Sequence, residues 1–345
     1  MIKSPAVVAC QTGTPTGQAS FGISDLGFDA IGNHLTEYRE ASGEQVVSIA
    51  PATLRFMQAN SMATPSQANM IPTLTNGLWF KAFGHQAKHD TEAAFSGYKS
   101  DGHGLTIGLD HRIDASTLVG AAVTASSTEL SQLNPAQAAS SDIQSYQGTL
   151  YANHQRANWF IDGLVGYTHQ LTKSTRTSGI GQADARFTSD VYNARVTLGK
   201  RLLHTASNTV ITPFASLQYD YLNRDAYQET GVGAVTVNKS NASRLTSGLG
   251  ARLQKSFDVG NRSLSTSLGA QWLHEYLQDG LNASGNAGLA TFLTPGQDPV
   301  EDIARLDTSI STALGSSSHL RLGYQYDVAS HYNSNYYELA FENWF

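Results

Sequence analysis

The sequence contains a single cysteine, Cys10, among 345 residues, which excludes an internal disulfide framework and any metal site built on several cysteines. Charged residues make up only 14% of the chain, less than the roughly one quarter that is usual in soluble domains. The formal net charge is −6, so the chain lacks the basic surface that a nucleic-acid partner requires, and no such partner is expected. It also lacks the run of about 18 to 20 apolar residues that a membrane-spanning helix needs.

From residue 77 to the end, apolar and polar residues alternate with a period of two. Leu105, Ile107 and Leu109, for example, are separated by small or polar residues, so one face of an extended segment is apolar. A strand of about ten residues, tilted by ~40°, rises through the ~25 Å apolar band of an outer membrane. Segments of this kind predict about twelve strands, at approximately 78–88, 101–113, 116–127, 143–155, 158–171, 188–202, 208–222, 243–256, 262–276, 302–315, 319–329 and 334–345.

The connections between these segments alternate in length. Tight turns are followed by long connections at roughly 88–101, 128–142, 171–187, 222–242 and 277–301. A soluble β-sandwich has the same apolar alternation with its apolar face inward, so the period alone does not separate the two folds. Long loops on one side and tight turns on the other are typical of an outer-membrane barrel. We therefore predict an all-β fold, a transmembrane β-barrel of about twelve antiparallel strands.

Residues 24–39 carry a helical pattern ahead of the first strand. Ser24 is expected to cap this helix and Gly43 to end it. A second stretch, 44–62, is weaker because Pro51 interrupts it. Apolar residues recur in the first helix at three- and four-residue steps, at Leu26, Phe28, Ile31, Leu35 and Tyr38.

The last strand runs to an aromatic carboxy-terminus without a polar tail, which is unusual for a soluble protein. This ending resembles the terminal strand of bacterial outer-membrane proteins, which the insertion machinery recognises, although Asn343 departs from the usual apolar residue. We expect Phe345 to close the barrel against Trp79 and Phe80 of the first strand. The residues predicted to form the assembly signal share the outward face of the strand: Tyr337, Leu339, Phe341 and Phe345.

Several short blocks occur in a recognisable order along the barrel region. The most distinctive is Gly97-Tyr98 followed by a Gly-x-x-x-Gly-x-Asp pattern at 104–110. Further blocks lie at 77–84, 145–151, 159–163, 212–215 and 229–231. Together they resemble the translocator domain of monomeric autotransporters, the type V secretion proteins, over about 24–345. The resemblance implies that the helix threads the pore and that an N-terminal passenger is exported to the cell surface.

The resemblance divides the chain into three regions: 1–23 as a passenger remnant or disordered leader, 24–76 as lumenal helix and linker, and 77–345 as the outer-membrane translocator barrel. It implies integral insertion in the outer membrane of a Gram-negative bacterium. The implied partners are the chain's own passenger, outer-membrane lipid and lipopolysaccharide, the barrel assembly machinery and periplasmic chaperones.

The polar faces of the strands should line the lumen and carry charges of both signs, so they do not form a single-sign selectivity filter. These charges either form a cradle for the helix, pairing with Glu37, Arg39 or Glu40, or make cross-strand pairs in a solvated interior. Asn33 could in principle cleave the passenger from within the helix, but we favour a polar residue facing the wall. The expected lumen-lining residues are Lys81, Asp110, Asp162, Arg195, Arg244, Arg252, Arg321, Glu338 and Glu342, and those of the plug helix are Asn33, Glu37 and Arg39.

Two other functions are compatible with a barrel: a stand-alone porin or adhesin, and an outer-membrane esterase. A porin has no reason to carry the helical stripe at 24–39. No Ser, His and Asp fall together on one barrel face, and the eleven histidines lack a metal-ligand spacing. We therefore expect no catalytic residues, no metal site and no cofactor.

Overall fold

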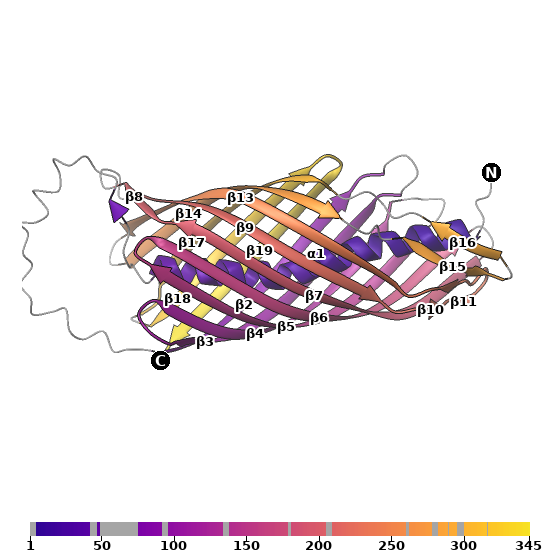
Figure 1. Cartoon of the computed structure of the whole chain (residues 1–345), viewed down its shortest axis with the longest axis horizontal. Helices are drawn as coiled ribbons and strands as arrows, with labels where there is room; N and C mark the ends of the chain where they lie inside the picture. Colours follow the sequence, from indigo (N-terminus) through magenta and orange to yellow (C-terminus); the bar gives the residue numbers. More distant parts are fainter. Residues whose placement is uncertain are drawn as a thin grey trace, which may run out of the picture.

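The computed structural model describes residues 5–41, 47–48, 75–91, 96–133, 138–178, 181–204, 209–259, 262–277, 282–288, 290–294, 300–315 and 317–345. Its centre is a closed barrel with one long helix, α1 (Pro5–Ala41), running through it (Figure 1). Within these residues, no helix combines the length and apolar character needed to cross a membrane.

The barrel wall consists of twelve antiparallel strands, each paired with its neighbour along the chain. The pairing of the last strand with the first and of β7 with β9 closes the ring. The predicted fold class is therefore confirmed. The strands are β2 (Asn76–His89), β3 (Tyr98–Arg112), β4 (Thr117–Gln132), β5 (Ala139–Arg156), β6 (Trp159–Ser178), β7 (Gly181–Lys200), β9 (Thr209–Arg224), β13 (Ser240–Val259), β14 (Arg262–Leu277), β17 (Asp302–Ala313), β18 (Ser318–Ala329) and β19 (Tyr332–Trp344).

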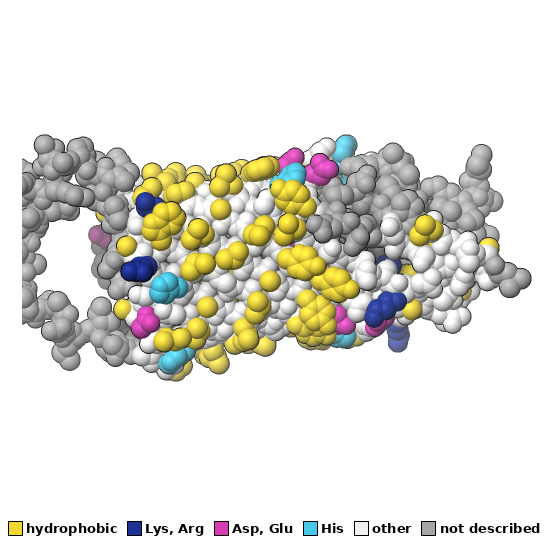
Figure 2. Space-filling view, in the orientation of Figure 1, with side chains coloured by type: hydrophobic (Ala, Val, Ile, Leu, Met, Phe, Trp, Pro, Cys, Tyr) yellow, Lys and Arg dark blue, Asp and Glu magenta, His cyan; other side chains and the backbone are white. Residues whose placement is uncertain are grey.

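The alternation along the strands places apolar side chains outside the barrel. In β3, Leu105, Ile107 and Leu109 are exposed on the outer face, whereas Thr106 and Asp110 are buried inside. Figure 2 shows the result on one face of the barrel, where apolar side chains spread across the wall between charged side chains at either edge. A wall in contact with lipid requires an apolar outer surface of this kind. It also requires that every backbone hydrogen bond is made within the wall, and the closed sheet meets that requirement.

Tight turns join the strands at the end of the barrel where the chain terminates (Figure 1). Between β3 and β4, the backbone N–H of Ser116 donates to Asp114 Oδ1 at 2.7 Å, which lowers the pKa of Asp114 and fixes the turn. Between β5 and β6, Ala157 adopts a φ of 55°, a left-handed conformation that closes a very short turn. Local turn chemistry therefore sets the strand register at this end.

The opposite, outer end of the barrel differs from the prediction. The segment 171–187 was expected to be a long loop, but β6 and β7 continue through most of it as a projecting hairpin. A strand of this length, 20 residues, rises to roughly 50 Å when tilted by ~40°, about twice the apolar band. The predicted connection 128–142 is likewise shortened by β4 and β5. The alternation of apolar and polar residues thus continues beyond the apolar band. There the apolar side chains pack in a second protein core instead of facing lipid.

That second core belongs to a small outer lobe, which consists of the projecting ends of β6 and β7 and several short strands. Phe187 stacks on Tyr227 with ring centroids 4.4 Å apart, and Val235 and Val237 are buried against them. One short strand pairs with β7 and the other four form a separate sheet. They are β11 (Thr230–Gly231), and β10 (Tyr227–Gln228), β12 (Thr236–Val237), β15 (Ala283–Ala287) and β16 (Ala290–Thr294).

A buried ion pair between Arg176 and Glu229 connects β6 to the rest of the outer lobe. Arg176 is 2% exposed, and its Nε donates to Glu229 Oε1 at 2.9 Å. A second guanidinium nitrogen of Arg176 donates to Glu229 Oε2 and to the carbonyl oxygen of Gly233 at 2.6 Å. The Glu229 carboxylate also accepts from the backbone N–H of Val235 at 3.2 Å. Bidentate pairs of this kind fix orientation as well as charge.

We expect Glu229→Ala to open the outer lobe, because it leaves Arg176 buried without its counter-charge. Breaking one partner of a buried pair costs about 3–5 kcal/mol. Limited proteolysis of the folded barrel in detergent should then cut the outer lobe much faster than in the unmodified protein. Asp90→Asn is the matched control, since it breaks the exposed Lys88–Asp90 pair (2.6 Å) on the same side. Equal proteolysis of both variants would contradict the assignment.

Helix α1 is longer than predicted. It begins at Pro5, so the part of the expected disordered leader from residue 5 to residue 23 is helical. Ser24 lies inside the helix and does not cap it; its hydroxyl contacts Thr168 Oγ1 and Asn193 Oδ1, each at 2.8 Å. Contact with the lumen wall extends the helix beyond the stretch that local signals support.

Parts of the predicted linker region fall outside the described residues, including Gly43 and most of 44–76. Within it, β1 (Val47–Ser48) pairs in parallel with β8 (Leu202–His204).

The last strand closes the barrel in a different register from the one expected. Phe345 pairs with Asn76 through two backbone hydrogen bonds of 2.9 and 3.2 Å. Phe80 lies opposite Phe341, with ring centroids 5.5 Å apart, and Trp79 is buried in the lumen. The expected contact of Phe345 with Trp79 and Phe80 is therefore wrong, because antiparallel pairing places the last residue against the beginning of β2.

Candidate functional site

The lumen has two different walls around α1. One wall, formed by β4 to β6 with parts of β2 and β19, packs a cluster of apolar side chains against the helix. Phe28, Ile31 and Leu35 are fully buried against it. The helical stripe predicted from the sequence thus packs on protein inside the barrel. The cluster on this side comprises Phe28, Ile31, Leu35 and Tyr38 of the helix, and Trp79, Leu118, Ala122, Tyr151, Leu164 and Trp344 of the wall.

Glycines allow the helix to approach this wall closely. A Cβ on Gly27 would lie 1.7 Å from Gln147 Oε1, and a Cβ on Gly166 would lie 2.6 Å from the ring of Phe28. Gln147 Nε2 also donates to the carbonyl oxygen of Ser24 at 3.1 Å. The helix therefore sits against one side of the lumen instead of on its axis.

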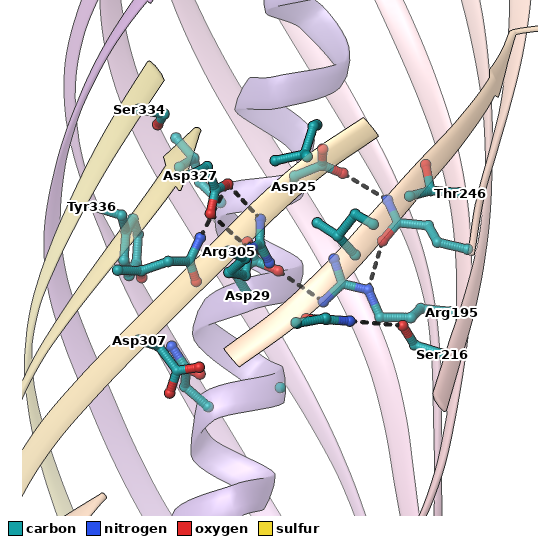
Figure 3. A pocket seen from close by; sticks show the side chains of 18 of the residues that line it. Asp25, Asp29, Arg195, Ser216, Thr246, Arg305, Asp307, Asp327, Ser334 and Tyr336 are labelled. Carbon is teal, nitrogen blue, oxygen red and sulfur yellow. Dashed lines mark hydrogen bonds and ion pairs between the residues drawn. The ribbon is translucent and has the colours of Figure 1, made fainter. Parts of the chain in front are cut away.

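The other wall is charged, and it meets an acidic face of the helix (Figure 3). Asp25 pairs with Arg244 of β13 at 2.7 Å. One turn later, Asp29 pairs with Arg195 of β7 at 2.8 Å and with Arg305 of β17 at 3.2 Å. The spacing of four residues brings both carboxylates onto one helix face.

Wall residues neutralise these arginines further. Arg244 also pairs with Asp220 of β9 at 2.7 Å and with Glu275 of β14 at 3.1 Å. Arg305 pairs with Asp327 of β18 at 2.8 Å. Each guanidinium therefore bridges the helix and the wall within a satisfied network, which fixes orientation even where the net stabilisation is small.

A second set of ion pairs lies nearer the tight-turn end. Glu37 contacts Lys81 of β2 and, at 3.0 Å, Arg321 of β18. Arg39 donates from one guanidinium nitrogen to both carboxylate oxygens of Asp162 of β6, at 2.7 Å. The C-terminal part of the helix thus meets the wall through charges of both signs.

All nine residues expected to line the lumen point into it. Eight of them contact α1 directly. Besides the pairs above, Asp110 contacts His34 at 2.8 Å, Arg252 donates to Thr36 Oγ1 at 3.0 Å, and Asn33 donates to Glu338 at 3.1 Å. The ninth, Glu342, accepts a hydrogen bond of 2.6 Å from Trp344 Nε1.

Of the wall arginines expected to meet Glu37 or Glu40, Arg321 does contact Glu37. Arg195 and Arg244 meet Asp29 and Asp25 instead, which the sequence did not indicate. The spacing of the two aspartates places them on one helix face, but it does not indicate which strands they meet. Also missed were His34, Asp220, Glu275, Arg305, Asp307 and Asp327.

A cavity of about 260 Å³, lined by both charged and apolar side chains, remains between the acidic face of α1 and the charged wall. Arg195, Arg305 and Asp327 line it (Figure 3), as does Arg244. The helix thus fills the apolar side of the lumen and leaves a narrow charged space on the other side. This arrangement suits a lumen that admits an extended or helical polypeptide and holds it by its charges.

Residues 78–325 match the family described as Autotransporter beta-domain. The chain belongs to this family. The β-domain is accordingly an integral protein of the bacterial outer membrane that mediates export of an N-terminal passenger. The porin or adhesin alternative lacks this support.

Two solved autotransporter structures share the fold. The translocator domain of NalP from Neisseria meningitidis is 15% identical, with a TM-score of 0.63 over 85% of this chain and 95% of that one. The β-domain of BrkA from Bordetella is 15% identical, with a TM-score of 0.61 over 79% of this chain and all of that one.

Relatives by sequence are much longer proteins. Outer membrane protein B of Rickettsia typhi is 22% identical over 95% of this β-domain, which spans only 20% of that protein. Esterase EstA of Pseudomonas aeruginosa is 24% identical over 81% of this chain, which covers 44% of its length. The β-domain is thus similar to one part of each relative.

Proposed function

We propose that α1 is the trailing end of the exported passenger, held in the lumen as a plug after export. The single observation that carries this is the set of ion pairs between helix and wall at successive levels of the lumen, from Asp25–Arg244 to Arg39–Asp162. The helix enters from the tight-turn end and its N-terminus lies at the outer lobe (Figure 1). Followed from its C-terminal end, which leads to the barrel wall, the helix therefore runs outward through the lumen.

The β-domain is proposed to work without turnover chemistry. Most charged groups of the lumen that the structure describes are engaged with the helix or with each other, as in Asp162 with Arg39 and Asp220 with Arg244. Their proposed role is to position the helix in the lumen. Residues 1–23 are proposed as the remnant of the passenger, 24–76 as lumenal helix and linker, and 77–345 as the translocator.

Several partners follow from this role. The apolar band would contact outer-membrane lipid and lipopolysaccharide. The outward face of β19, with Tyr337, Leu339 and Phe345 exposed, would meet the barrel assembly machinery after delivery by periplasmic chaperones. The passenger is the remaining partner, attached N-terminally to α1.

Export is tested by fusing a signal peptide and a folded reporter to residue 1 and expressing the fusion in a Gram-negative host. We expect the reporter on the cell surface, where added protease removes it from intact cells while a periplasmic marker stays uncut. Deletion of 332–345 is the control, since it removes β19 and the closing pair of strands. A folded, inserted barrel whose reporter stays protected would contradict the proposed function.

A further inference from the structure

Three potential metal ligands converge where α1 passes β19. His34 and Glu37 lie one turn apart on the same face of the helix, and Glu342 comes from the last strand. One ligand atom from each of these residues lies within 4.8 Å of the others, and all three residues are buried or nearly so. The three side chains therefore converge at one place between helix and wall.

The imidazole of His34 is held as a metal-ligating imidazole would be. Its Nε2 lies 2.8 Å from Asp110 Oδ2, and its ring stacks on Trp79 with centroids 4.3 Å apart. Tyr151 donates to the other Asp110 oxygen at 2.6 Å and accepts from Trp79 Nε1 at 2.8 Å. A carboxylate that accepts from one ring nitrogen orients the ring and leaves the other nitrogen's lone pair free for an ion.

That other nitrogen, Nδ1 of His34, is the independent observation that points to a ligand. His34 is 0% exposed, and Nδ1 has no hydrogen-bond partner among the described residues. Buried polar atoms are nearly always satisfied, so an orphaned one beside two carboxylates requires an explanation. A bound cation supplies one.

The charges where the three side chains converge are also unbalanced. Of the four carboxylates around this place, Glu37 and Glu338 pair with Lys81 and Arg321, and Asp110 pairs with His34. Among the described residues, Glu342 forms no ion pair. A divalent cation would offset this surplus of negative charge, which burial makes costly.

We propose that His34 Nδ1, Glu37 and Glu342 bind a first-row divalent cation, with Zn²⁺ as the best match, and that the ion fastens α1 to β19. The ion pairs of Glu37 use Oε1, and the hydrogen bond from Trp344 also goes to Oε1 of Glu342. The Oε2 atoms of both carboxylates are therefore the ones to turn toward the ion. One imidazole with two carboxylates suits Zn²⁺ better than Mg²⁺ or Ca²⁺, which prefer oxygen ligands alone.

The geometry needs only side-chain movement. Ligands ~2.1 Å from a tetrahedral ion lie about 3.4 Å from each other, so the three atoms must approach by roughly 1 Å. Rotation about the terminal torsions of the two glutamates can provide this, while Asp110 and Trp79 keep the imidazole in place. A water molecule would complete the fourth position.

The test uses the intact chain, refolded in detergent, stripped with a chelator and then titrated with Zn²⁺. We expect one Zn²⁺ per barrel by elemental analysis, and the absorption bands of a tetrahedral site when Co²⁺ replaces Zn²⁺. His34→Gln and Glu342→Gln should abolish stoichiometric binding. Asp110→Asn removes no proposed ligand but alters the carboxylate that bonds the imidazole and Tyr151, and it should weaken binding by about 10- to 100-fold.

His85→Gln is the matched control and should bind Zn²⁺ like the unmodified protein. His85 is also buried in the lumen with an unpartnered Nδ1, but its side chain bonds Ser100 and it is not part of the cluster. Each variant must show the unboiled gel shift of a folded barrel. Absence of stoichiometric binding by the folded protein, or equal binding by His34→Gln and Glu342→Gln, overturns the proposal.

Discussion

Deletion of residues 1–43 is expected to raise the single-channel conductance of the barrel several-fold in planar bilayers. The deletion removes all of α1, whose side chains fill the apolar side of the lumen and leave a cavity of about 260 Å³. A ring of twelve strands without a plug encloses a polar channel that water and ions can enter. The wall would then present Arg195, Arg244 and Arg305 to the solution.

Folding should survive this deletion, because the hydrogen-bonded ladder from β2 to β19 does not include the helix. The truncated barrel should keep the unboiled gel shift of a closed sheet. Asp25→Asn with Asp29→Asn provides a finer variant that retains the helix and removes its anchors to Arg244, Arg195 and Arg305. We expect frequent openings of this double variant, with a conductance that approaches that of the truncated form.

Similar conductance of the truncated and complete forms would show that the helix does not block the lumen in the membrane. That result would remove the structural support for α1 as a plug. It would leave the family assignment untouched, since the match covers residues 78–325 of the wall.

Deletion of Phe345 is expected to lower outer-membrane insertion far more than deletion of one residue within 281–290. Phe345 makes two backbone hydrogen bonds with Asn76 at the seam of the barrel. Its side chain is 57% exposed on the outer face, so it contributes little to the packing of the finished barrel. Gly288 of the outer lobe is the control deletion, because it lies between β15 and β16, which pair outside the ring of twelve strands.

Phe345→Ala separates the two contributions. It keeps the backbone pairing with Asn76 and removes only the exposed ring. If the ring serves recognition during assembly, this variant should insert poorly in cells and yet refold in detergent with nearly unchanged thermal stability. Membrane fractionation measures the first quantity and the gel-shift temperature measures the second. Equal insertion of the Phe345 and Gly288 deletions would refute a special role for the terminus.

The strands and their faces could be predicted because they depend on local alternation. A strand in lipid must alternate at nearly every position, so Leu105, Ile107 and Leu109 mark one face unambiguously. The same parity placed Lys81 and Arg321 on the inner face, where the helix lies. The outer lobe escaped prediction because β6 and β7 extend past the membrane with Phe187 packed on Tyr227 from another loop.

Alternation along the chain and the alternating lengths of the connections are therefore sufficient for the number of barrel strands, the barrel class and the face on which the lumen-lining residues lie. The length of α1, the pairing of Asp25 and Asp29 with arginines from three strands, and the meeting of His34 with Glu342 depend on tertiary contacts. Those contacts join residues that are far apart in the sequence. A period of two or 3.6 residues shows which face of an element a side chain lies on, but not which distant side chain it contacts. The closed barrel determines which residues pair, because a charge buried inside it can interact only with the side chains that the fold places next to it.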